Sequence, residues 1–241
     1  MSLPFKIYIR TTLQRTLDPS IDRELTQKGI PFELLVDHEH KPVESFLDQL
    51  EHISSHDSIL LEDDVVLCRN FVHEVAQAIT SCVNNGWGNY LINFFNSPSL
   101  YFTTHLSFTD FCYNQCTYYP AGLAAKIAKK MREIHARTPH FPYDTLEKNA
   151  LMALSIPYVK YRPCLVQHLD IDTLVQKMTR NNRRTIYFKD YLDDLHITMD
   201  NATLHLYNLQ KKFKEHFDTI EERTNKESLE DTVAASDDKD I

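Results

Sequence analysis

The chain has 241 residues, of which 42% are hydrophobic and 11% aromatic, and this is enough to build one sizeable core. Its net charge of −8 provides no overall basic field that would attract nucleic acid or an anionic membrane. The sequence contains no secretion leader, no apolar stretch of membrane-spanning length and neither GxGxxG nor GxxxxGK[ST], so we expect a soluble, cytoplasmic protein without a dinucleotide fingerprint or a P-loop.

The first 85 residues alternate between strand and helix patterns. Short apolar or alternating runs predict three strands, at residues 5–10, 32–37 and 58–61. Apolar periodicity and capping residues predict three helices, at residues 18–29, 43–52 and 70–83, with Asp18 and Asn70 as N-caps and Gly29 as a C-terminal stop. This β-α-β-α-β-α order predicts an α/β fold with a mostly parallel central sheet flanked by helices.

The second half of the chain is less regular. A strand is expected at 90–95, and short mixed strands are expected within the aromatic, turn-rich stretch 99–119. The remaining predicted elements are helices at 123–136 and 145–154 and strand-like runs at 156–161 and 163–168. Asp144 is a natural N-cap for the helix at 145–154, and Glu147 would complete a capping box.

The C-terminal part differs in composition from the rest. A basic cluster is followed by a helix at about 200–221 with an apolar stripe, and residues 222–241 are polar and charged. The cluster consists of Arg180, Arg183, Arg184 and Lys189. We therefore expect a folded domain over residues 1–175, a helical extension over 176–221 and a disordered tail over 222–241.

Three consecutive carboxylates, Glu62, Asp63 and Asp64, follow the strand predicted at 58–61. In an extended chain Glu62 and Asp64 would share one face and Asp63 would point to the other. Open α/β sheets bind their ligands at this end of their strands, and buried carboxylates need a positive partner. A divalent cation is one such partner, and a solvated acidic turn is the alternative.

Two motifs resemble known glycosyltransferases. Residues 61–64 (Leu-Glu-Asp-Asp), placed after β-α-β-α-β, resemble the acidic motif of GT-A enzymes, as in the lipooligosaccharide glycosyltransferase family 25. Residues 163–168 (Pro-Cys-Leu-Val-Gln-His) are similar to the P-x-L-x-Q-H segment that ends the catalytic domain of N-acetylglucosaminyltransferase IV-like enzymes. With the elements between them, the motifs cover residues 5–175. The resemblance implies a Rossmann-like GT-A domain that transfers a sugar from a nucleotide sugar, such as a UDP-sugar, to a hydroxyl group.

The resemblance also implies roles for individual residues. Asp64 and His168 would bind Mn²⁺ or Mg²⁺, which neutralises the charge that develops on the departing diphosphate. The residues expected to contact the donor are Arg10, Thr11, Asp37, Glu62, Asp63 and Gly122. The catalytic base of an inverting enzyme would be Asp144, with Glu147 in reserve.

These assignments leave alternatives open. His168 could be a structural histidine, Asp37 a turn former, and Asp144 and Glu147 simple helix caps. The acceptor could be a surface glycan or a hydroxymethylated DNA base. Two other functions fit the same pattern: a nucleotidyltransferase with an acidic metal site, and a non-catalytic GT-A-like assembly protein that forms a homodimer through its C-terminal helix.

Overall fold

The computed structural model describes residues 3–95, 104–108, 111, 114–169, 185, 187–194 and 196. The chain divides into two compact units, residues 1–196 and 197–241, and every described residue belongs to the first. Within the first unit, the side chain of Gln167 binds the backbone of Thr185. The predicted C-terminal helix, the tail and the three arginines of the basic cluster lie outside the described residues.

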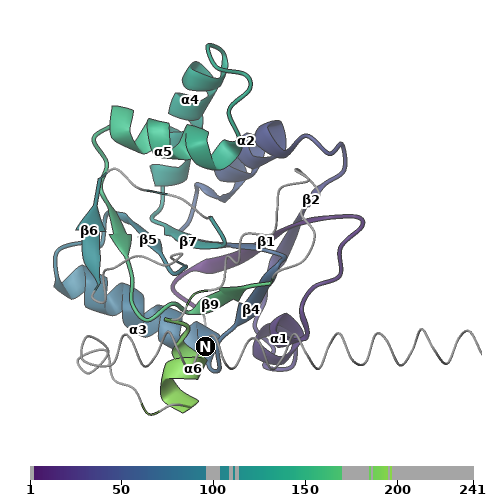
Figure 1. Cartoon of the computed structure of the whole chain (residues 1–241), viewed down its shortest axis with the longest axis vertical. Helices are drawn as coiled ribbons and strands as arrows, with labels where there is room; N and C mark the ends of the chain where they lie inside the picture. Colours follow the sequence, from purple (N-terminus) through teal and green to yellow (C-terminus); the bar gives the residue numbers. More distant parts are fainter. Residues whose placement is uncertain are drawn as a thin grey trace, which may run out of the picture. The chain divides into compact units, whose positions relative to one another are not determined.

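A central sheet forms the core of the first unit (Figure 1). Within the described residues it has seven strands, in the spatial order β2 (Glu33–Asp37), β1 (Lys6–Thr12), β3 (Ser58–Glu62), β7 (Cys116–Tyr119), β5 (Leu91–Asn93), β8 (Tyr158–Lys160) and β6 (His105–Ser107). The neighbours β2–β1, β1–β3 and β5–β8 are parallel, whereas β3–β7, β7–β5 and β8–β6 are antiparallel. The predicted α/β class is confirmed, and the carboxyl ends of β1, β2, β3, β5 and β8 meet at one edge of the sheet.

A second, two-stranded sheet pairs β4 (Val65–Leu67) with β9 (Val166–His168). Strand β4 follows the three acids directly and was not predicted from the sequence. Its antiparallel register sets Val65 opposite His168. The acidic run and the second sequence motif are therefore neighbours in the fold.

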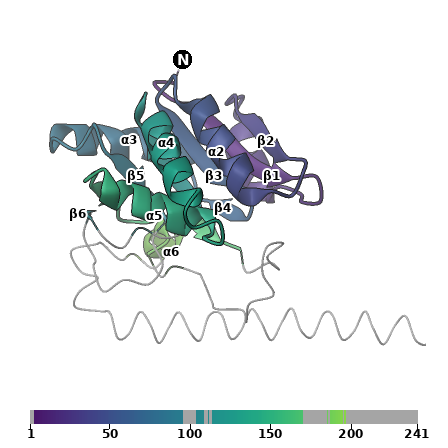
Figure 2. The same ribbon diagram turned by 90° about the horizontal axis from the view of Figure 1, so that it is seen from above.

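Helices cover both faces of the central sheet, above and below it in Figure 1, and Figure 2 looks down on one of these two helical layers. One face packs against α1 (Pro19–Ile21), the π-helical turn η1 (Asp22–Thr26), α3 (Phe71–Asn84) and α6 (Lys189–Asp194), and the other packs against α2 (Pro42–Ile53), α4 (Leu123–His135) and α5 (Tyr143–Ala153). Strand periodicity decides which residues face which layer: Ile7 and Ile9 join the first core, and Tyr8 joins the second. None of the helices in the described part of the chain has the length and apolarity that a membrane span requires.

Local capping explains where the first helices begin and end. The Asp18 carboxylate accepts the N–H of Ser20 at 2.8 Å, as predicted, and Gly29 ends this segment with a φ of +65°. Asn70 occupies the N-cap position of α3, but its side chain makes no capping bond. Glu24 accepts the N–H of Phe71 instead, so a carboxylate from η1 caps α3.

Candidate functional site

The three acids lie at the carboxyl end of β3, in the centre of the sheet. The strand ends at Glu62, and Asp63 and Asp64 form the bend that leads into β4. Arg15 Nη1 lies 2.6 Å from Asp63 Oδ1 and 3.2 Å from Asp64 Oδ2. Both aspartates are 6% exposed. The expectation that Asp63 points away from Asp64 is wrong, because strand alternation stops one residue before them.

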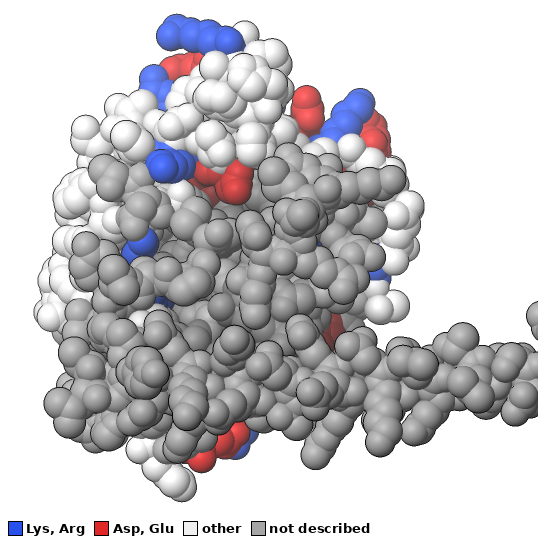
Figure 3. All heavy atoms as spheres, viewed as in Figure 1, with Lys and Arg blue, Asp and Glu red and all other residues white. Residues whose placement is uncertain are grey.

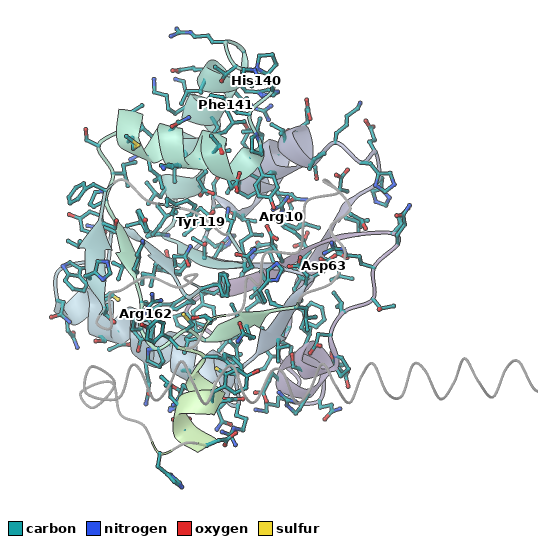
Figure 4. The ribbon with its side chains drawn as sticks, viewed as in Figure 1. Arg10, Asp63, Tyr119, His140, Phe141 and Arg162 are labelled. Carbon is teal, nitrogen blue, oxygen red and sulfur yellow. The ribbon has the colours of Figure 1, made fainter. Side chains whose placement is uncertain are left out.

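Glu62 has a different partner, Arg10, which is its neighbour in the parallel register of β1 and β3. Arg10 Nη1 lies 3.1 Å from Glu62 Oε1, and Arg10 Nε donates to Gln49 Oε1 of α2 at 2.7 Å. The guanidinium carbon also lies 4.5 Å from the ring centroids of both Phe46 and Tyr143. Tyr143 donates its hydroxyl to Glu62 Oε1 at 2.7 Å. Arg10 and Glu62 thus connect the sheet to α2 and α5 (Figure 4).

The electrostatic environment follows from burial and close charges. Burial and the nearby Asp64 raise the pKa of the Glu62 carboxyl, against the opposing effect of Arg10. Burial likewise raises the pKa of Asp64, with Asp63 adding to the rise and Arg15 opposing it. The two arginines therefore stabilise the ionised forms of acids that burial disfavours.

His168 lies beside Asp64, the residue with which the resemblance paired it. Its Nε2 atom lies 3.6 Å from Asp64 Oδ2, and the N–H of Leu169 donates to the Asp64 carbonyl oxygen at 2.8 Å. The imidazole is buried, and its ring centroid lies 6.2 Å from that of Phe95. The two residues predicted as metal ligands are thus brought together from distant parts of the sequence.

The donor types at this position suit Mn²⁺ or Mg²⁺, because carboxylate oxygens and an imidazole nitrogen are available. Asp64 Oδ1 is buried and has no hydrogen-bond partner within the part of the chain that the structure describes. Among those same residues, no three His, Cys, Asp or Glu side chains are arranged so that they could hold a metal ion together. The positive charge between Asp63 and Asp64 is supplied by Arg15.

Glu147 belongs to a separate, neutral hydrogen-bond network between α5 and β7. Its side chain is fully buried, Tyr119 donates to Oε1 at 2.7 Å, and Asn114 donates to Oε2. Thr117 in turn donates to Asn114 Oδ1 at 2.7 Å. Burial raises the pKa of Glu147 to about 8. The predicted capping-box role is wrong, because the side chain is buried and accepts hydrogen bonds from Asn114 and from Tyr119, which Figure 4 labels.

Asp144 lies in the first turn of α5 and is half-buried. The helix begins at Tyr143 with Pro142 as its N-cap, so Asp144 is not the N-cap that the sequence predicted. Its Oδ1 atom accepts the N–H of Thr145 at 2.7 Å. Because the adjacent Tyr143 binds Glu62, Asp144 is carried on the turn of α5 that faces the acids.

Thr11 and Asp37 lie at the same edge, at the carboxyl ends of β1 and β2. Thr11 donates its hydroxyl to the Thr12 carbonyl oxygen at 3.3 Å. One Asp37 oxygen accepts the N–H groups of both Glu39 and Lys41 at 3.2 Å. Asp37 therefore forms the turn after β2, which was its alternative role.

Gly122 is not brought to the acids. Its N–H donates to the Ser54 carbonyl oxygen at 2.7 Å, and the N–H of Ala121 donates to Asp57 Oδ1 at 2.8 Å. Residues 54–57 precede β3, so Gly122 lies at the amino end of that strand, on the edge opposite the acids. A φ of +79° at the start of α4 explains why this position is a glycine.

Several residues of the site were not predicted from the sequence, namely Arg15, Gln49, Asn114, Tyr119 and Tyr143. Only Gln49 carried a local signal, since it is a polar residue on the apolar face of the predicted helix at 43–52. Lys189, the described member of the basic cluster, pairs with Asp193 at 3.0 Å and lies 3.7 Å from Glu74. On the face shown in Figure 3, the described basic and acidic side chains are interspersed.

Comparison with known proteins gives a distant structural similarity. Neither a protein-family model nor a curated protein matches the sequence. A similar solved structure is titled "Crystal Structure of A197 from STIV". It shares 12% sequence identity with the chain, with a TM-score of 0.43, over 74% of this chain and 100% of that one.

We predict that Arg10→Met lowers the free energy of unfolding by about 3–5 kcal/mol at pH 7, because it leaves the buried Glu62 without its cation. Urea unfolding measures this change. Adding Glu62→Gln to this variant should recover much of the lost free energy of unfolding, since no uncompensated buried charge then remains. The matched control is Arg23→Met, whose arginine is half exposed and pairs with Glu24, with an expected cost below about 1 kcal/mol. A loss in Arg10→Met no larger than in this control would contradict the prediction.

We predict a pH dependence of stability that originates from Glu147. The unfolded chain releases this proton near pH 4.5, whereas the folded protein keeps it until about pH 8. Between these values the folded state binds more protons, so the free energy of unfolding falls as the pH rises. Glu147→Gln should flatten this dependence, and Glu44→Gln, at an exposed acid, should not. Equal pH profiles for wild type and Glu147→Gln in urea unfolding would exclude this role.

Proposed function

We propose that the protein is a metal-dependent GT-A glycosyltransferase that uses a nucleotide sugar, with a UDP-sugar as the donor. The observation that carries the proposal is the position of Asp64 and His168, whose Oδ2 and Nε2 atoms lie 3.6 Å apart at the carboxyl edge of the sheet. Ligands of open α/β sheets bind at this edge. The parallel order β2–β1–β3 that precedes the acids also agrees with the proposed fold.

Asp64 and His168 would hold Mn²⁺ or Mg²⁺, and the diphosphate of the donor would supply further oxygen ligands. The bound ion would act as a Lewis acid that offsets the charge developing on the leaving diphosphate. Asp64 is the preferred ligand among the acids, because one of its buried oxygens lacks a hydrogen-bond partner among the described residues. Glu62 is less suited to bind an ion, since Arg10 and Tyr143 both contact its Oε1 atom.

The donor nucleoside would lie over the carboxyl ends of β1 and β2, near Thr11 and the turn at Asp37. Arg10 would not contact the donor directly, since its guanidinium already binds Glu62 and Gln49. It would hold Glu62 in position instead. Gly122 has no part in this proposal, because it lies at the opposite edge of the sheet. The acceptor is a hydroxyl group, carried by a glycan or by a hydroxymethylated DNA base.

Asp144 is better placed than Glu147 to act as the catalytic base. Glu147 is fully buried and, with a pKa of about 8, protonated at neutral pH, so it has no route to an acceptor hydroxyl. Asp144 is half-buried, and Thr145 binds only one of its oxygens. A base must reach the proton that it removes. We therefore assign this role to Asp144 and a structural role to Glu147.

We predict that UDP together with Mn²⁺ raises the melting temperature of the wild-type protein, because a ligand that binds only the folded state stabilises it. The shift should be much smaller for Asp64→Ala, and it should persist in Asp22→Ala, which removes an exposed acid. Differential scanning fluorimetry measures both shifts. The absence of a shift with any nucleoside diphosphate would overturn the proposed donor.

We predict that Asp144→Asn abolishes transfer while leaving donor binding intact, since the amide cannot accept the acceptor proton. The same thermal shift with UDP and Mn²⁺ reports binding, and nucleotide release in the presence of acceptor reports transfer. Glu147→Gln should retain measurable transfer. Full turnover in Asp144→Asn would remove this residue from the base role.

A further inference from the structure

Arg15 lies against two of the acids at the proposed cation site. It belongs to the loop between β1 and α1, and a single nitrogen, Nη1, contacts Asp63 Oδ1 at 2.6 Å and Asp64 Oδ2 at 3.2 Å. The side chain of Arg15 is only 15% exposed. One guanidinium thus joins two adjacent carboxylates that would otherwise repel each other in a largely buried position.

This arrangement leaves part of the site unsatisfied. Arg15 contacts only Oδ2 of Asp64, and the buried Oδ1 has no hydrogen-bond partner among the described residues. His168 Nε2 lies 3.6 Å from the same Oδ2 atom. Asp64 Oδ2 therefore lies near both Arg15 and His168, and an ion bound between Asp64 and His168 would lie close to the guanidinium. The two cations would repel each other strongly there, because little water screens their charges.

The two arginines of the site differ in how they are held. Arg10 lies on β1, and its guanidinium binds Gln49 and covers the rings of Phe46 and Tyr143. Arg15 follows β1 in a turn, with its N–H bound to the Thr12 carbonyl oxygen at 3.2 Å. The neighbouring Leu13 is 69% exposed. Moving Arg10 would break its contacts with α2 and α5, whereas Arg15 lies in the loop between β1 and α1, where Leu13 and Gln14 are exposed.

We propose that Arg15 is an internal counter-ion for Asp63 and Asp64, which a divalent cation displaces when it binds. The inference rests on the proposed function, because it takes the same acids as the cation site. It adds that Arg15 weakens cation binding by competing for the carboxylates, and that cation binding is coupled to movement of the β1–α1 loop. By linkage, removal of Arg15 must then strengthen cation binding.

The experiment measures Mn²⁺ binding to the full chain without nucleotide, by isothermal titration calorimetry. Arg15→Met, which keeps the aliphatic part of the side chain, should bind Mn²⁺ about tenfold more tightly than wild type, a typical size for such a coupling. Arg15→Lys keeps the charge and should fall between the two. Arg23→Met removes a half-exposed arginine that pairs with Glu24 and should bind as wild type does.

A second measurement separates competition from a general effect on folding. Without Mn²⁺, Arg15→Met should melt at a lower temperature than wild type, because two acids have lost their cation. With Mn²⁺, its increase in melting temperature should exceed that of wild type. If Arg15→Met does not fold without Mn²⁺, the comparison of Arg15→Lys with wild type decides between the two results.

Each outcome bears on the inference. Tighter binding by Arg15→Met, lost again when Asp64→Asn is added, supports it. Equal or weaker binding by Arg15→Met, with measurable binding by wild type, overturns the role of Arg15 and leaves the proposed function standing. Absence of Mn²⁺ binding by every variant overturns the inference together with the metal site, and UDP-induced stabilisation would then test the donor site separately.

Discussion

The balance of charge at the carboxyl end of β3 is the constraint on which the rest of the structure depends. Three neighbouring carboxylates can be buried together only because two guanidinium groups, from β1 and from the loop after it, lie against them. Arg10 reaches Glu62 through the parallel register of β1 and β3. The same arginine fixes α2 through Gln49, and Glu62 fixes α5 through Tyr143. The charge pair therefore determines how the helical layer covers this edge.

A second contact of similar importance is the pairing of β4 with β9. It sets Val65 opposite His168, and it joins the acidic bend to the end of the domain. The acid of α5 has a different environment: Glu147 is surrounded by neutral donors and keeps its proton. The described residues of this edge thus include a charged group around the three acids and a neutral hydrogen-bond network around Glu147. Of these two, the charged group is the one that attracts a cation.

The sequence was sufficient for the features that depend on local patterns. The first three strands, the helices between them and the position of the acids all follow from periodicity, capping and composition. Features that depend on the register between strands distant in the sequence could not be predicted from the sequence. Arg15 has no local signal, because its partners are reached across a turn, and Gly122 was assigned to the wrong edge because β7 runs antiparallel to β3. The side-chain directions predicted from strand alternation were also wrong beyond Glu62, because the sequence pattern does not show at which residue the strand ends.

The structure suggests why this edge has three acids rather than two. Glu62 binds an arginine on a strand and a tyrosine on a helix, so its carboxylate helps to hold the helix against the sheet. Asp63 and Asp64 are engaged by an arginine in a loop. Under our proposal, exchanging Arg15 for a divalent cation would leave Arg10, Glu62 and Tyr143 in place. Asp144, the next residue of α5, would then keep its position while the ion and its ligands rearrange, because the acid that positions α5 is not an acid that binds the ion.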